Sequence, residues 1–220
     1  SSEWGPLEPG HCRPIWATLK PPSYGDLDLD TYGVVHPRPQ TVYNLVCLPK
    51  EVVIDDFDYL ESPLAQGWTV PPKQTATGDV TTTYDQELGR RVMQVRSKAE
   101  DGFMIVRWMR VYSRPELTLW IKSASNFIIY VRVRDLDGEY YYVQYMPLAW
   151  PNYPDEFPEG RYIYYPLGSY FADGKWHRLE RDVYEDFFAK TGMEVDYIEA
   201  LSIRAYEDLA LADLRLEVRK

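Results

Sequence analysis

The sequence has few cysteines, no excess of basic residues and no long apolar run. Only two of its 220 residues are cysteine, and 24 lysines and arginines stand against 34 acidic residues, for a formal net charge of −10. A chain of this charge lacks the basic surface by which proteins bind nucleic acid or anionic lipid. No stretch of about 18 apolar residues is present, so the sequence predicts no membrane insertion.

Several sequence signatures of catalysis are also missing. There is no glycine-rich phosphate loop, and no serine or cysteine lies in a recognisable nucleophile motif. The three histidines, His11, His36 and His177, have no cysteine or acid at ligand spacing, which argues against a zinc site. The sequence therefore indicates neither a nucleotide-dependent enzyme nor a zinc protein.

The two cysteines, Cys12 and Cys47, bear on the cellular compartment. The chain starts Ser1-Ser2-Glu3 without a methionine, as a processed or trimmed chain does, and removal of an export signal is one such processing step. In an exported protein the two cysteines would form a disulfide, and closing that loop would stabilise the fold by about 3–4 kcal/mol. In a cytosolic protein they would be two unrelated thiols. We expect an extracellular, cell-surface or periplasmic protein with the disulfide.

The first 50 residues differ in composition from the rest of the chain. They contain eight of the 17 prolines, and proline disfavours the interior of a sheet. We therefore expect residues 1–50 to form an irregular, proline-rich arm that is docked on the domain, with one strand over residues 41–48.

Residues 51–220 show a succession of short strands, with aromatic residues at 15% of the whole chain and 19 tyrosines. Many short strands at regular spacing predict an all-β sandwich or barrel. One short helix is expected over residues 183–190, because Thr191-Gly192 is a helix stop signal. The expected strands cover residues 52–59, 68–70, 80–84, 91–96, 103–108, 117–122, 127–134, 140–146, 161–165, 176–181, 197–205 and 210–218.

Residues 126–146 predict a hairpin with an unusual surface. Apolar and polar residues alternate over residues 127–134, and Asp137-Gly138 favours a tight turn. A loop with an even number of residues places Tyr141 and Tyr145 beside the arginines of the first strand, and this is our expectation. A bulge that makes the loop odd would exchange the faces of the second strand.

If residues 117–122 pair with residues 127–134, one sheet face collects aromatic and basic side chains. Aromatic rings pack on the C–H faces of sugars, and polar groups orient the hydroxyls. Guanidinium groups also bind carboxylates in a two-pronged contact, which would favour an acidic sugar. The alternative is that the arm covers this face. The predicted ligand-binding residues are Trp120, Lys122, Tyr130, Arg132, Arg134, Tyr141 and Tyr145.

Three motifs of residues 51–220 together resemble the jelly-roll sandwich of carbohydrate-binding modules and galactose-binding-like domains. They are VVIDDFDY at 52–59 followed by Gly67-Trp68, DGKWHRLERDV at 173–183, and the ending YIEALSIRAYEDLALADLRL. The resemblance implies a jelly-roll fold. The last strands of such modules commonly end in two acids and an apolar residue, and here the first acid is replaced by Ala212.

The resemblance also implies a structural calcium ion where the first and last strands meet. Asp213 together with Asp55, Asp56 or Asp58 would supply the oxygen ligands, although acids at strand ends are commonly just solvated. We expect Asp56 and Asp213 to be ligands of this ion.

A third reading of the acidic stretch is catalytic. The spacing of Asp56, Asp58 and Glu61 faintly resembles the paired acids of jelly-roll glycoside hydrolases, but those enzymes have glutamate at the first position. We therefore expect no enzyme.

The sequence as a whole predicts a non-catalytic domain of an exported or cell-surface protein that binds a polysaccharide or another glycan. The first alternative is a structural or adhesion-like accessory domain whose aromatic face binds another protein in a larger surface assembly. The second is a jelly-roll enzyme that acts on glycosides.

Overall fold

The computed structural model describes residues 12–14, 45–47, 51–112, 115–147 and 161–218. The chain divides into two compact units, Ser1–Lys50 and Glu51–Lys220. In the first unit, strands β1 (Cys12–Pro14) and β2 (Leu45–Cys47) pair antiparallel, with Cys12 opposite Cys47. The docking of the arm on the second unit stays a prediction.

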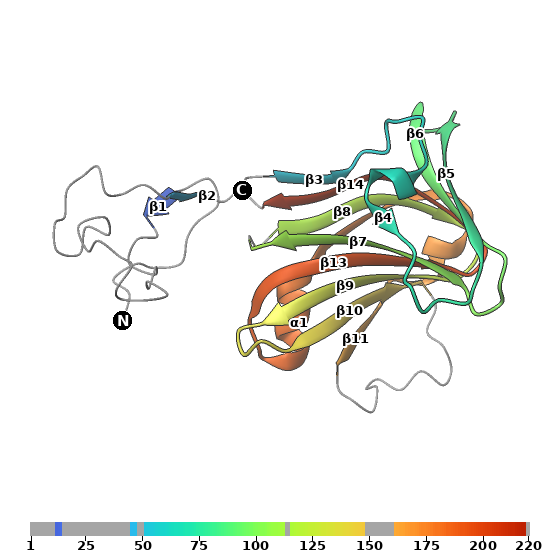
Figure 1. The fold of residues 1–220 in the computed structure, drawn as a ribbon. Helices are drawn as coiled ribbons and strands as arrows, with labels where there is room; N and C mark the ends of the chain where they lie inside the picture. Colours follow the sequence, from blue (N-terminus) through green and yellow to red (C-terminus); the bar gives the residue numbers. More distant parts are fainter. Residues whose placement is uncertain (1–11, 15–44, 48–50, 113–114, 148–160, 219–220) are drawn as a thin grey trace, which may run out of the picture. The chain divides into compact units, whose positions relative to one another are not determined.

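The second unit is a sandwich of two sheets, as the sequence predicts (Figure 1). Its only regular α-helix in the described part is α1 (Val183–Thr191), one residue longer than expected. Two short 3-10 helices, Pro63–Gln66 and Ser169–Ala172, lie in connections between strands. The predicted all-β jelly-roll class with one short helix is confirmed.

One sheet, here called the β9 sheet, has the strand order β11-β10-β9-β13-β7-β4. All its pairs are antiparallel except that of β10 with β11, which is parallel. Its strands are β4 (Trp68–Thr69), β7 (Phe103–Val111), β9 (Phe127–Asp135), β10 (Tyr140–Met146), β11 (Tyr162–Pro166) and β13 (Val195–Ala205).

The other sheet, here called the β14 sheet, has the order β12-β8-β14-β6-β5, and β3 pairs with the end of β14 that extends beyond β6. Every pair in it is antiparallel. Its strands are β3 (Glu51–Asp55), β5 (Gly78–Asp85), β6 (Arg90–Ser97), β8 (Pro115–Ser123), β12 (Trp176–Asp182) and β14 (Asp208–Val218).

The main core lies between the two sheets and follows the alternation seen in the sequence. Leu117, Leu119 and Ile121 of β8 are buried in the same cluster as Ile129 and Val131 of β9. Because both strands contribute every second residue to this core, the pattern fits either neighbouring strands of one sheet or facing strands of two sheets. The prediction that residues 117–122 pair with residues 127–134 is wrong, since β8 pairs with β12 and β14 and lies in the other sheet.

The hairpin of β9 and β10 has an odd loop. Arg134 is opposite Tyr140, and three residues separate the next pair, Asp135 and Glu139. Gly138 takes a φ of 94°, and the Asp135 carboxylate accepts a 2.8 Å bond from the Glu139 N–H. The even-loop prediction is therefore wrong, and each side chain of β10 lies on the face opposite to the expected one.

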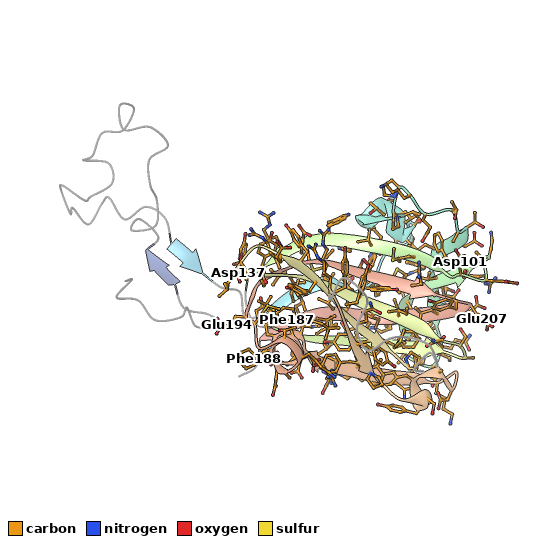
Figure 2. The ribbon with its side chains drawn as sticks, turned by 90° about the horizontal axis from the view of Figure 1, so that it is seen from below. Asp101, Asp137, Phe187, Phe188, Glu194 and Glu207 are labelled. Carbon is orange, nitrogen blue, oxygen red and sulfur yellow. The ribbon has the colours of Figure 1, made fainter. Side chains whose placement is uncertain are left out.

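Helix α1 begins and ends with capping residues. Asp182 accepts a bond from the Glu185 N–H at the start, and Gly192 takes a φ of 69° at the end. Figure 2 shows the hairpin loop at Asp137 at the same end of the sandwich as Phe187 of α1, and the turns at Asp101 and Glu207 at the opposite end. Helix α1 contacts strands of both sheets, so it helps to hold them together.

Candidate functional site

Aromatic side chains on the outer face of the β9 sheet lie in rows that run across the strands. One row runs from Tyr162 on β11 through Tyr142, Arg132 and Ala200 to Trp108 on β7. The rings of Tyr142 and Tyr162 stack at 5.0 Å with 15° between their planes. Trp108 is 56% exposed. The small side chain of Ala200 leaves a depression between two aromatic walls.

The next row continues the depression along the strands. It places Tyr130 of β9, Ser202 of β13 and Val106 of β7 side by side, with Thr69 of β4 at the edge. Together the two rows form a groove with a volume of about 380 Å³. We call it the aromatic groove, and it is lined by Thr69, Pro71, Pro72, Met104, Val106, Trp108, Tyr130, Arg132, Tyr142, Tyr162, Ala200, Ser202 and Arg204.

A second apolar cluster supports the groove from the outer face of the β9 sheet. Ile128, Tyr130 and Met146 are buried there, separate from the main core, and Met104 and Tyr162 pack against them. This cluster therefore packs beneath the side of the groove that Tyr130, Tyr142 and Tyr162 form.

One edge of the groove is held by Gln74. Its side chain accepts a 2.8 Å bond from the Met104 N–H and donates a 3.1 Å bond to the Met104 carbonyl. These two bonds lie at the edge of β7 beyond the last residue of β4, and they take the place of the backbone bonds that a neighbouring strand would form. Pro71, whose carbonyl accepts a 3.0 Å bond from the Gln74 N–H, lines the same groove together with Pro72.

Arg132 lies in the middle of the aromatic side chains. Its guanidinium carbon is 4.2 Å from the ring centre of Tyr140, 5.5 Å from that of Trp108 and 5.7 Å from that of Tyr142. At these distances a guanidinium is attracted to the negative ring faces. Arg132 therefore orders rings on both walls of the groove.

Two bulges in β13 bring carboxylates to the arginines of β9. Relative to β9, the register shifts between Val195 and Tyr197 and again between Ile198 and Ala200. The extra residues are Asp196 and Glu199. A bulge redirects side chains relative to the regular alternation of a strand, and each of these acids forms an ion pair with an arginine of β9.

The structure divides the predicted ligand-binding residues among three places. Tyr130, Arg132 and Arg134 lie on the outer face of the β9 sheet, as predicted. Trp120 and Lys122 lie on the outer face of the β14 sheet, where Lys122 pairs with Glu87 at 2.8 Å. The prediction of one shared face is wrong, because β8 and β9 belong to different sheets.

Tyr141 and Tyr145 are turned away from the groove by the odd hairpin loop. Tyr141 packs against the main core, and Tyr145 is fully buried in it. Burial and the neighbouring Asp186 raise the pKa of Tyr145 well above its usual range. Its hydroxyl donates a 2.7 Å bond to Asp186. These two tyrosines are structural residues.

Asp186, a residue of helix α1, is the centre of a polar cluster between the helix and the neighbouring strands. Arg181 donates bonds of 2.9 and 2.5 Å to the two carboxylate oxygens, and the Tyr165 hydroxyl donates to the Asp186 carbonyl. The Arg181 guanidinium also lies 5.1 Å from the Tyr165 ring centre. The cluster joins α1 to β10, β11 and β12, so its role is in the fold.

The two proposed calcium ligands have different surroundings. Asp56 is exposed. The carboxylate of Asp213 lies 2.6 Å from Arg215 Nε and 3.3 Å from an Arg90 nitrogen. Among the residues that the structure describes, no group of three possible ligands is close enough to hold a metal ion. The calcium site stays a prediction.

The acids considered for catalysis lie after the end of β3, which stops at Asp55. Asp56 accepts a 3.1 Å bond from the Asp58 N–H, and Glu61 accepts a 2.6 Å bond from Gln66. None of the three lines the aromatic groove.

Sequence reasoning missed Trp108, Tyr142 and Tyr162. Trp108 occupies a solvent-facing position in the alternation Met104, Val106, Trp108, and that signal was available in the sequence. The even hairpin loop that we expect from the sequence would turn Tyr142 towards the core, whereas the odd loop places it beside Arg132. Glu199 has no sequence signal, since the bulge that presents it cannot be read from composition or periodicity.

No protein-family model and no curated protein matches the chain. Among solved structures, 46 chains match. A family 11 carbohydrate-binding module from Clostridium thermocellum, in complex with a beta-1,3-1,4-mixed-linked tetrasaccharide, is 10% identical with a TM-score of 0.46, over 76% of this chain and 95% of that one. This is the class of module that the sequence resembles.

Two further matches contain catalytic modules. The CBM22-1-GH10 modules of Clostridium thermocellum endo-1,4-beta-D-xylanase 10B, complexed with xylohexaose, are 14% identical with a TM-score of 0.46, over 78% of this chain and 29% of that one. An exo-beta-agarase is 12% identical with a TM-score of 0.43, over 76% of this chain and 25% of that one. At these values the comparisons concern the strand arrangement and carry no argument about a ligand.

In the part of the chain that the structure describes, no helix is long and apolar enough to cross a membrane.

Proposed function

We propose that residues 51–220 form a non-catalytic carbohydrate-binding domain of an exported or cell-surface protein, and that the aromatic groove holds the glycan. The observation that carries this proposal is the arrangement of exposed Trp108 opposite the stacked pair of Tyr142 and Tyr162, with Ala200 and Ser202 as a low floor between them.

The chemistry of the groove suits a sugar. A pyranose ring has apolar C–H faces that pack on aromatic rings and a rim of hydroxyl groups that need hydrogen-bonding partners. Rings form the walls here, while Ser202, Thr69 and Arg204 supply polar groups along the same groove. A volume of about 380 Å³ is within the range of small-ligand sites.

Binding without catalysis is supported by the residues that line the groove. Glycoside hydrolysis by the common mechanisms needs two carboxyl groups on either side of the scissile bond. The described lining residues of the groove include no aspartate or glutamate. The groove therefore provides stacking and hydrogen bonding but no acid–base pair.

Affinity electrophoresis of the whole chain against a panel of soluble neutral and acidic polysaccharides tests the proposal. Trp108→Ala should weaken binding by about tenfold or more, as expected for an aromatic hot spot worth roughly 1–3 kcal/mol. Trp120→Ala is the matched control, because it removes the same ring from the outer face of the other sheet. Its affinity should equal that of the wild type.

Two results would contradict carbohydrate binding at this site. The first is a folded wild type that no polysaccharide retards. The second is an equal loss of affinity in the Trp108→Ala and Trp120→Ala variants. Either result would favour the alternative, an accessory domain whose tryptophan, tyrosine and arginine side chains bind another protein, since these residues are also enriched in protein interfaces.

A further inference from the structure

The two arginines that the sequence suggests as carboxylate binders already have carboxylate partners in the fold. Arg132 Nε lies 3.0 Å from Glu199 Oε2, and an Arg134 terminal nitrogen lies 3.3 Å from Asp196 Oδ2. Of these two arginines, only Arg132 lines the aromatic groove, which Arg204 also lines. Glu199 does not line the groove itself, so its charge acts there through its pairing with Arg132.

The Arg132–Glu199 pair is shielded from solvent. The side chains are 23% and 17% exposed, and the Nε and Oε2 atoms themselves are buried. The two atoms form an ion pair rather than an aligned hydrogen bond. At this depth screening by salt is weak, so the negative charge of Glu199 cancels much of the attraction that Arg132 would exert on an anion.

A β-bulge in β13 places Glu199 next to Arg132. Glu199 is the extra residue of a β13 bulge relative to β9, and Ala200, the next residue, is level with Arg132. Bulges are common next to functional sites, where they redirect side chains. Here the bulge puts a carboxylate and a small floor residue at adjacent positions opposite one arginine.

We propose that Glu199 is a specificity-determining residue, which keeps Arg132 as a support for the aromatic walls and makes the groove select neutral over acidic glycans. This inference rests on the proposed function. A uronic acid bound to Arg132 would lie near the Glu199 charge or would have to displace Glu199 from Arg132. A neutral sugar stacks on Trp108 and Tyr142 and leaves the ion pair intact.

Glu199→Gln tests the inference, because glutamine keeps the size of the side chain and removes its charge. We expect the wild type to bind neutral polysaccharides and to bind a polyuronate at least about tenfold more weakly. In Glu199→Gln the affinity for the polyuronate should rise by about tenfold. The affinity for neutral polysaccharide should change by less than about threefold.

Asp196→Asn is the matched control. It removes the same charge from the second bulge, where the partner Arg134 does not line the groove. Because the net charge of the two variants is equal, a gain that is confined to Glu199→Gln comes from the groove. Melting temperatures of both variants show whether the fold is intact.

Arg204 needs its own variant, since it also lines the groove. A wild type that binds polyuronate as tightly as neutral glycan, and loses that binding in Arg204→Gln, would overturn the inference and leave carbohydrate binding standing. An equal gain in Glu199→Gln and Asp196→Asn, or no gain in either, would also overturn it. If the wild type binds no glycan of either kind, the proposed function fails and the inference fails with it.

Discussion

The indole N–H of Trp68 donates a 2.7 Å hydrogen bond to the buried carboxylate of Asp55. The same carboxylate accepts a 2.9 Å bond from the Phe57 N–H and a 3.0 Å bond from the Tyr59 hydroxyl, and Arg107 lies 3.6 Å away. Asp55 is the last residue of β3, which belongs to the β14 sheet, and Trp68 begins β4 of the β9 sheet. The bond therefore connects the first strands of the two sheets along the chain, β3 and β4.

Loss of the Asp55 carboxylate should destabilise the sandwich strongly. Asp55→Ala leaves the buried Trp68 N–H without its acceptor and Arg107 without its ion-pair partner, so we expect the free energy of unfolding to fall by about 2–4 kcal/mol. Urea unfolding followed by tryptophan fluorescence measures the change. Asp56→Ala, measured in chelator, is the control, since this neighbouring side chain is exposed and should change stability by less than about 0.5 kcal/mol. Equal effects of the two substitutions would contradict the role of Asp55.

The tyrosines around Asp186 predict a loss of stability at alkaline pH. Burial and Asp186 raise the pKa of Tyr165 to about 12 and raise that of Tyr145 as well. In the unfolded chain both should have a pKa of about 10. Their protonated forms are favoured in the folded state. The contribution of these two tyrosines to the free energy of unfolding is therefore complete below about pH 10 and is lost as the pH rises towards about 12.

Melting temperatures at several pH values between about 9 and 12 test this prediction. The wild type should lose stability over this interval. Tyr165→Phe removes one of the titrating groups together with its bond to the Asp186 carbonyl, so it should be less stable at neutral pH and show a shallower alkaline decline. Tyr84→Phe is the control, because Tyr84 is an exposed tyrosine on the β5 strand. A wild-type melting curve that does not change up to about pH 12 would contradict the assignment.

A disulfide between Cys12 and Cys47 is the next prediction. The backbone register of β1 and β2 places the two residues opposite one another. Cα atoms of directly opposed residues are about 4.5–5.5 Å apart, which is compatible with a disulfide. Intact mass measured after denaturing alkylation should show no added alkyl group without prior reduction and two added alkyl groups after reduction. Alkylation of both cysteines before reduction would exclude the bond.

The calcium hypothesis also has a direct test. An ion that binds only the folded protein stabilises it by mass action, so a chelator should lower the melting temperature and added calcium should restore it. Asp213→Asn should abolish this response if Asp213 is a ligand. The contacts of Asp213 with Arg90 and Arg215 favour the opposite outcome, in which Asp213 binds no ion and a chelator leaves the melting temperature unchanged. An unchanged melting temperature in chelator would leave the arginines as the partners of this carboxylate.

Local patterns in the sequence determined where strands form and which side of most of them is buried. The alternation in residues 117–122 and 127–134 identified the inward residues of β8 and β9 correctly, because burial of one strand face is a property of that strand alone. The stop signal at Gly192 likewise placed the end of α1, because a glycine with positive φ acts within one turn of the helix.

Only the tertiary structure decided which strands are neighbours and which functional side chains meet. Trp120 and Arg132 were separated because strand pairing depends on the whole topology of the sandwich, and alternation is the same for strands of one sheet or of two. Tyr141 and Tyr142 exchanged faces because one additional loop residue inverts every position that follows. Glu199 reached Arg132 through a bulge, which depends on contacts with the neighbouring strands, and so the charge of the groove could not be predicted from the order of the residues.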